Sequence, residues 1–209
     1  QLGEQFRRGA MLHFDGVNAN GGSGGRTVEL TSLDDGYEPE RCAANTKTLI
    51  DKGVFALFGY VGTPTSLAAL PLATAAKTPF FAPFTGAEAL RAPFNRYAFH
   101  VRASYIDETA EIVEQIATMG GKRVAVFYQN DSYGKAGLDG VQRALEPMGL
   151  QPVALGTVER NTVDVDAAVK AIVAGQPDAI VQISAYKSCA AFIRAVRKAG
   201  FHGSIYNVS

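Results

Sequence analysis

VFALFGYVGTPTSLAALPLA (residues 54–73) joins one short apolar run to another through a junction of glycine, threonine, proline and serine. A continuous apolar run of this length is typical of a strand buried on both faces of a parallel sheet. Pro64 favours the first turn of a helix, where its missing N–H costs no hydrogen bond. The stretch therefore predicts a strand over residues 54–59 and a helix over 64–77, with Thr63 as the N-cap.

The start of this predicted helix has the donors to hold an anion. The amides of Thr65 and Ser66 are expected in the first turn without a helical partner, beside the Thr63 hydroxyl. Backbone donors and the positive end of the helix dipole coincide at such a helix start. A helix that is only well capped has the same sequence, so both interpretations remain open.

The alternation of strand and helix extends along the chain. Helices are predicted over residues 3–20, 39–53, 106–119, 134–148, 164–174 and 187–199, and strands over 26–33, 79–84, 96–104, 123–128, 151–157, 179–184 and 204–208. Such alternation indicates an α/β fold with parallel sheets. The break near residues 95–104 predicts two doubly wound parallel-sheet lobes joined by a hinge, with lobe 1 over 1–102 and lobe 2 over 103–209. The fold is expected to be incomplete at both ends, because the first element is a helix and doubly wound lobes usually begin with a strand.

Composition excludes several classes of protein. The chain has 209 residues, 47% of them hydrophobic, which is enough for a folded core. Twenty basic residues balance twenty acidic ones without a Lys/Arg block, which argues against nucleic acid as a partner. Two distant cysteines, Cys42 and Cys189, and three scattered histidines show no metal-ligand spacing, so we predict no metal and no cofactor.

No catalytic motif stands out at the ends of the predicted strands. Asp34-Asp35 suggests a phospho-acceptor site, but that chemistry needs an aspartate where Gly59-Tyr60 stands. The glycines of residues 21–25 and 134–140 lack the order or spacing of a nucleotide fingerprint. The strand ends carry glycine, hydroxyl and aromatic side chains instead, which predicts binding without catalysis, not an enzyme.

Six segments carry a family resemblance. They are GGSGGRTVELTSLDDGYEPERCAANTKTLID (21–51), FGYVGTPTS (58–66), TPFFAPFTGAEALR (78–91), FHVRASYIDE (99–108), VAVFYQNDSYGKAG (124–137) and FIRAVRKAGFHGSIYN (192–207). In combination they resemble the type I periplasmic solute-binding proteins of ABC importers, specifically the branched-chain amino acid (Leu/Ile/Val) binding family. The resemblance runs along essentially the whole chain.

This resemblance implies a set of ligand-binding residues. They are Gly62, Thr63 and Thr65 on the first loop, where hydroxyls and amides hold the ligand carboxylate; Phe84, Thr85 and Gly86 on the second; Tyr133 and Tyr186 from lobe 2; and Ser209. The family's second-loop threonine falls on Gly86, with Thr85 beside it as a substitute. Ser209 occupies the position of the acid that holds an amino group, and Leu2 that of a covering aromatic. Tyr37 and Gly62 occupy the positions of the family's disulfide.

The resemblance also implies a function and a location. We expect an extracytoplasmic component of an ABC importer that closes two lobes over a small carboxylate-bearing ligand and presents it to a membrane permease. A ligand-sensing or receptor domain of the same fold is the alternative. Export to the periplasm is expected, with a signal peptide outside this chain, and the family has a strand before residue 1 and a long stretch after residue 209.

Overall fold

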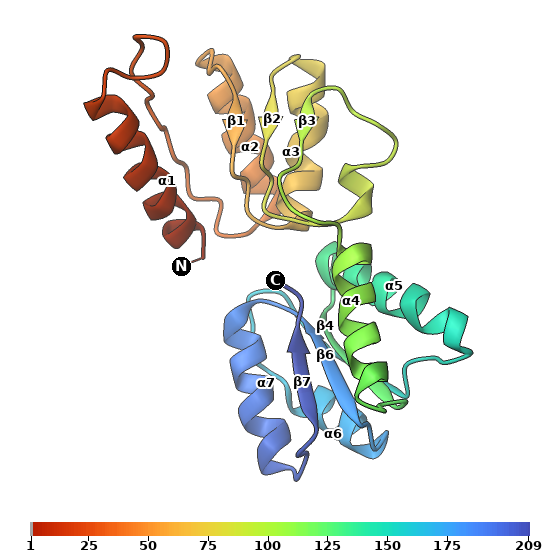
Figure 1. The fold of residues 1–209 in the computed structure, drawn as a ribbon. Helices are drawn as coiled ribbons and strands as arrows, with labels where there is room; N and C mark the ends of the chain where they lie inside the picture. The colour runs from red at the N-terminus through yellow and green to blue at the C-terminus, as the bar shows by residue number, and fades with distance from the viewer. Residues whose placement is uncertain (1) are drawn as a thin grey trace.

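The computed structural model describes residues 2–209 and contains two parallel sheets one above the other (Figure 1). The first lobe holds α1 (Leu2–Ala19), α2 (Pro39–Asp51), β1 (Leu57–Phe58), α3 (Thr63–Ala75), β2 (Phe80–Phe81), the short helix η1 (Glu88–Leu90) and β3 (Ala98–Phe99). The second lobe holds α4 (Tyr105–Thr118), β4 (Val124–Gln129), α5 (Ser132–Leu145), η2 (Glu146–Met148), β5 (Ala154–Val158), α6 (Asp166–Ala174), β6 (Ala179–Ile183), α7 (Tyr186–Lys198) and β7 (Ser204–Asn207). The predicted α/β class with two successive sheets is confirmed.

Both sheets are entirely parallel. The first has the order β1-β2-β3 and the second the order β5-β4-β6-β7. Residues 100–104 carry the chain from β3 to α4, and the predicted lobe boundary after residue 102 falls in this segment. That boundary stays a prediction, because a fold with two sheets does not by itself fix where a domain ends.

The predicted strand over residues 26–33 is wrong. Apart from an isolated bridge between Ser23 and Arg26, these residues form no ladder. The alternating pattern fits a strand, but pairing requires a neighbouring strand, and none among residues 2–209 lies in register with them. The other first-lobe strands are shorter than predicted, with two residues each in β1, β2 and β3.

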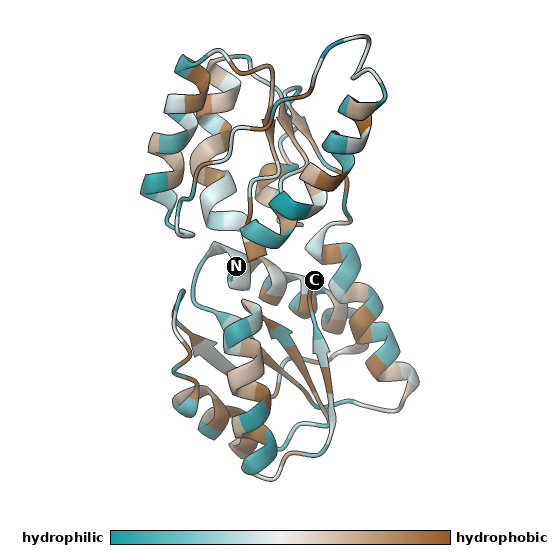
Figure 2. Cartoon of the chain, turned by 90° about the vertical axis from the view of Figure 1, so that its left-hand side faces the viewer, coloured by the Kyte–Doolittle hydropathy of each residue, from teal (hydrophilic) through white to brown (hydrophobic). Residues whose placement is uncertain are grey.

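The second sheet is buried on both faces. Alternate residues of β4 point to opposite sides: Val124 and Val126 pack with α4 and α5, whereas Ala125 and Phe127 pack with α6 and α7. Phe127 stacks on Phe192 at a centroid distance of 4.0 Å. Figure 2 shows the corresponding pattern, with apolar colour concentrated on the strands and polar colour on the outward side of the helices.

The first sheet is covered unevenly. Leu57 and Phe80 are buried against α2 and α3, together with Leu70 and Ala73. On the opposite face Phe58 meets the rings of Phe6 and Phe14 from α1. Farther along this face, Phe81 and Phe99 remain 43% and 46% exposed.

Charged groups fix the start of the central strands in the second lobe. Asp178 precedes β6, and its Oδ2 accepts the amides of Lys122 and Arg123, each at 2.9 Å, just before β4. These amide bonds hold the pKa of Asp178 below its usual range. The ends of β4 and β6 that lie away from the first lobe are thereby tied together.

Candidate functional site

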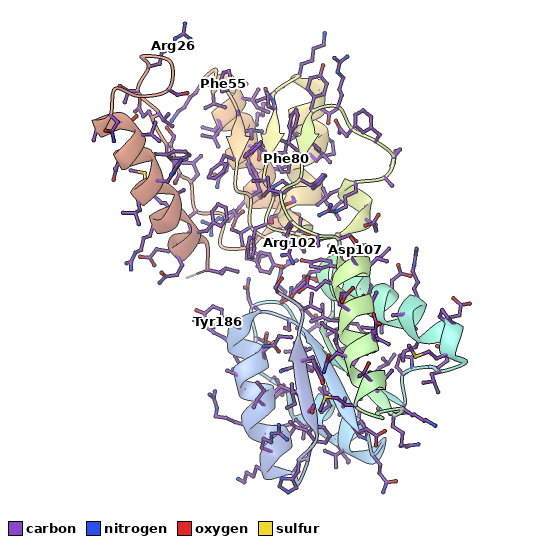
Figure 3. The ribbon with its side chains drawn as sticks, viewed as in Figure 1. Arg26, Phe55, Phe80, Arg102, Asp107 and Tyr186 are labelled. Atoms are coloured by element: carbon purple, nitrogen blue, oxygen red, sulfur yellow. The ribbon has the colours of Figure 1, made fainter. Side chains whose placement is uncertain are left out.

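The candidate site lies where the two sheets face each other. β7 points toward the first lobe in Figure 1, and the chain leaving β3 enters α4 at the same level. The carboxyl ends of parallel strands from both sheets therefore meet in the middle of the molecule, where open α/β sheets bind ligands. Figure 3 shows Arg102 at this junction and Tyr186 at the end of α7 that faces the first lobe.

Gly62, not Thr63, is the N-cap of α3. Gly62 has φ +93°, and Thr63 is the first helical residue, so the predicted N-cap role of Thr63 is wrong. A Cβ on Gly62 would lie 2.2 Å from the Tyr37 ring. The positive φ and the close ring both favour glycine here, and the Tyr37 ring covers the start of the helix.

Thr63 and Thr85 are brought together as a buried pair. Each is 1% exposed, and their hydroxyl oxygens are 2.6 Å apart, which links the loop after β1 to the loop after β2. Thr85 Oγ1 also accepts the amide of Ala87 at 3.1 Å. Since one hydroxyl donates to the other, one proton of the pair has no acceptor among residues 2–209.

Thr65 and Ser66 differ from the prediction. The Ser66 amide donates to Gly62 O at 3.1 Å, so the prediction that it is free is wrong: starting the helix at Thr63 brings this carbonyl within reach. The Thr65 hydroxyl donates to Val61 O at 2.5 Å, whereas the Thr65 amide has no acceptor in the described chain. The Ser66 hydroxyl is fully buried and also lacks a partner within residues 2–209.

Phe84 and Gly86 lie at the connection between the lobes. The Phe84 ring packs against Phe6 and lies 5.4 Å from the Arg102 guanidinium. Gly86 O accepts the amide of Tyr105 at 2.8 Å, and a Cβ on Gly86 would approach that residue to 2.8 Å. A threonine at position 86 would therefore collide with the start of α4, so Thr85 supplies the hydroxyl of this loop.

The predicted residues of the second lobe are dispersed. Tyr133 packs its ring on Tyr105 at 5.4 Å, and burial raises the pKa of its phenol well above the usual value. Tyr186 begins α7 and is 50% exposed. Ser209 is exposed; its amide bonds to Glu108, and its hydroxyl accepts from Arg102 at 2.7 Å.

A hollow of about 360 Å³ lies beside these residues. It is lined by Phe6, Ala82, Pro83, Phe84, Val101, Arg102 and Ser209. Two predicted residues, Phe84 and Ser209, contribute to it, whereas the hydroxyls of Thr63 and Thr85 do not. A larger hollow of about 610 Å³ lies between α6 and α7, away from every predicted site residue.

The sequence did not single out one group of side chains at this junction. Tyr37 OH accepts from Gln129 Nε2 at 3.3 Å, and burial together with the nearby Asp131 raises the Tyr37 pKa. Glu38 binds Arg160 and Asn161, each at 2.8 Å. We call these five residues (Tyr37, Glu38, Gln129, Arg160 and Asn161) the interlobe cluster. In the sequence, these residues are marked only by their position in the segments that follow predicted strands.

No group of three or more His, Cys, Asp or Glu side chains in residues 2–209 could hold a metal ion. Cys42 and Cys189 are both buried free thiols. No described helix is long and apolar enough to cross a membrane.

Comparison with known proteins places these features in a family. Residues 1–209 match a family model described as periplasmic binding protein. A Brucella abortus protein named Leu/Ile/Val-binding protein homolog 8 is 26% identical over 210 residues, covering 96% of this chain and 52% of that protein. The chain thus spans about half the length of this curated relative.

Solved structures agree with the fold. A possible leucine/isoleucine/valine-binding protein from Rhodopirellula baltica has a TM-score of 0.94 and 38% identity, covering 100% of this chain and 58% of that one. A substrate-binding periplasmic protein from Ralstonia solanacearum has a TM-score of 0.91 and 31% identity, covering 96% and 57%. These TM-scores show that both solved structures share the fold of this chain.

Proposed function

Because the chain belongs to the periplasmic binding protein family, we propose that it forms the ligand-binding lobes of an exported solute-binding protein that serves an ABC importer. A small molecule with a carboxylate binds between the lobes, and the closed complex is presented to a membrane permease. The names of the relatives, which include Leu/Ile/Val binding and periplasmic substrate binding, support this proposal. Turnover of the ligand is not part of it.

One observation carries the proposal: unused donors gather at the start of α3. Ser66 lies one helical turn after Thr63, so both side chains lie on the same face. The buried Ser66 hydroxyl, the spare proton of the Thr63–Thr85 pair and the Thr65 amide all lack acceptors within residues 2–209. Buried donors without acceptors cost free energy, and a bound carboxylate offsets that cost.

Movement of the second lobe and of Tyr37 gives the ligand access. In the arrangement described, Thr63 and Thr85 are covered and the Tyr37 ring lies over the helix start. A ligand therefore enters when the lobes separate about residues 100–104, and it stabilises the closed form by contacts that only this form offers. Tyr133 and Tyr186 are proposed to complete the site from the second lobe.

Ser66→Ala tests this proposal. The substitution removes a hydroxyl that has no partner in the described chain, so the free energy of unfolding should stay equal or rise slightly. If the hydroxyl binds a carboxylate, affinity should fall about 10- to 150-fold, as expected for a charge-assisted hydrogen bond of roughly 1.5–3 kcal/mol. Ser204→Ala, at an exposed residue of β7, is the matched control.

The measurement is titration calorimetry on the full-length protein with L-leucine and with 4-methylpentanoate, which lacks the amino group of leucine. Binding of both with similar affinity indicates that the carboxylate is recognised and the amino group is not, as the serine at position 209 suggests. Unchanged affinity of Ser66→Ala for a ligand that binds would contradict the proposed site.

A receptor or sensor domain is the second candidate. One structural neighbour, from Rhodopseudomonas palustris, is named an extracellular ligand-binding receptor. Permease and ATPase genes adjacent to the gene for this protein would favour transport, and a neighbouring signalling or regulatory gene would favour the receptor.

A further inference from the structure

The interlobe cluster joins the two lobes through side chains of which only Tyr37, whose ring lies over the start of α3, borders the proposed ligand site. Glu38 Oε2 accepts from Arg160 at 2.8 Å, and Glu38 Oε1 accepts from Asn161 at 2.8 Å. Asn161 also donates to Gly36 O at 3.3 Å. Each of these bonds spans more than 100 residues of sequence, so none of them forms unless the lobes approach each other.

Both sides of the contact are held in place by their own lobes. On the first lobe, Asp34 and Asp35 accept the amides of Gly36 and Tyr37 at 2.9 and 2.8 Å and shape the turn. On the second lobe, Thr162 donates to Glu159 O at 2.9 Å, in the turn that presents Arg160. Preorganised partners lose little conformational entropy when they meet.

Glu38 occupies an N-cap position without capping its helix. It precedes α2, where serine or aspartate would accept an amide of the first turn, yet the Glu38 side chain makes no cap hydrogen bond. Its carboxylate extends to the second lobe instead. The side chain at this N-cap position therefore makes a contact between the lobes and leaves the first turn of α2 uncapped.

Arg160 collects further interactions in the same place. Its guanidinium lies 5.9 Å from the centre of the Tyr37 ring and 3.9 Å from Asp131. The Arg160 side chain is 26% exposed and that of Glu38 45% exposed, so water weakens the ion pair without abolishing it. Stacking on a ring and two carboxylates favour arginine over lysine at this position.

The cluster lies at the opposite edge of the sheets from the chain connection. Arg160 follows β5, one edge strand of the second sheet, whereas Ser209 follows β7, the other edge strand. Arg102, after β3, bonds to Ser209 and Glu108 at that other edge. The two sets of contacts therefore bracket the gap between the carboxyl ends of the strands.

We propose that the interlobe cluster is a ligand-independent clasp that draws the lobes together at the edge opposite residues 100–104. Closure by the clasp does not depend on the proposed function; its effect on affinity does, because only closed molecules complete the site. Glu38 and Arg160 are positioning residues in this scheme. Loss of the Glu38 charge should lower the ratio of closed to open ligand-free molecules about two- to fivefold.

Pulsed electron paramagnetic resonance on the ligand-free, full-length protein tests the proposal. Spin labels are placed at Lys47→Cys on α2 and Lys135→Cys on α5, both exposed. The native thiols are buried, and desolvation raises the pKa of Cys42 to about 12 and that of Cys189 to about 11, so labelling favours the introduced cysteines.

Three variants of the cluster and one control variant distinguish the possible results. Glu38→Gln and Arg160→Gln should each shift the distance distribution toward longer values, Arg160→Gln more strongly, and 0.5 M NaCl should produce a similar shift in the wild type. Arg160→Lys keeps the charge and should recover part of the closed population. Glu40→Gln, in the first turn of α2, is the control, because Glu40 is exposed and has no ion pair in the described chain.

Distance distributions of Glu38→Gln and Arg160→Gln identical to that of the wild type would overturn the proposal. This result would leave the ligand proposal standing, since no ligand is present. Conversely, a shifted distribution together with failure of leucine and 4-methylpentanoate to bind would support the clasp and contradict the proposed ligand.

Discussion

The two sheets differ in how completely helices cover them. In the second sheet every residue of β6 is buried, and helices pack on both faces. In the first sheet one face carries a buried cluster, while Phe81 and Phe99 on the other face stay about half exposed. Burial removes apolar surface from water, so the second lobe has the larger source of stability, and the first lobe should open at lower cost.

Matched phenylalanine deletions give the largest expected difference. Phe127→Ala removes a fully buried ring stacked on Phe192 and should cost about 3–5 kcal/mol of unfolding free energy. Phe81→Ala, in the first sheet, removes a half-exposed ring and should cost about 1 kcal/mol. Urea titrations of both variants measure the difference. Equal losses would show that the first sheet is as well covered as the second.

Two glycines with positive φ, one at a helix end in each lobe, allow the cost of an alanine substitution to be compared between the lobes. Gly62 precedes α3 and faces the Tyr37 ring, whereas Gly120 follows α4 in open space. Gly120→Ala should cost about 1 kcal/mol for the backbone conformation alone. Gly62→Ala should cost about 2–3 kcal/mol, because the ring must also move. Calorimetric melting of the two variants measures this difference. A Gly62→Ala protein that is no less stable than Gly120→Ala would contradict the close contact between position 62 and the Tyr37 ring.

The smallest expected effect concerns pH. Burial, then the neighbouring Arg91, lowers the pKa of His100 in the first lobe. The folded state therefore binds this proton more weakly than the unfolded state, so the contribution of His100 is intact above the unfolded pKa and declines as the pH falls below it. Its Nε2 donates to Leu90 O at 3.0 Å, and its buried Nδ1 has no acceptor in residues 2–209 for a second proton.

His100→Gln should flatten the dependence of stability between pH 7 and pH 5. Urea midpoints of the variant and the wild type at both pH values measure this. An unchanged pH dependence in the variant would assign the titration to other groups. The hydrogen-bonded Asp107 and Asp178 of the second lobe, whose pKa values are lowered, should act only at more acidic pH.

The same contrast separates what the sequence predicts from what it does not. Predominantly apolar runs such as residues 124–128 and 179–183 predict strands correctly, because burial on both faces leaves a strong local signal. Residues 26–33 alternate like a strand but form none, because pairing depends on a neighbour elsewhere in the chain. The local sequence pattern therefore predicts the strands of the second lobe more accurately than those of the first.

Prediction of the candidate site has a similar limit. The hydroxyl-rich junction of residues 62–66 can be found by its composition, and the structure pairs Thr63 with Thr85 there. The N-cap lies at Gly62, and the Tyr37 ring leaves no room for a Cβ there; this contact between separate segments is not revealed by sequence spacing. The hydrogen bond between Arg160 and Glu38 joins residues 122 positions apart, and no periodicity encodes such a contact.

The buried strands of the second lobe also bear on how the newly made chain stays soluble. VAVFY (124–128) and AIVQI (179–183) contain no charge, proline or glycine, so in an unfolded chain they are prone to form intermolecular β-structure. Lys122 and Arg123 stand directly before the first segment and Asp178 directly before the second. These charges oppose aggregation while the chain is unfolded. After folding, the amides of Lys122 and Arg123 donate hydrogen bonds to the Asp178 carboxylate. The same three residues therefore oppose self-association in the unfolded chain and align β4 with β6 in the folded one.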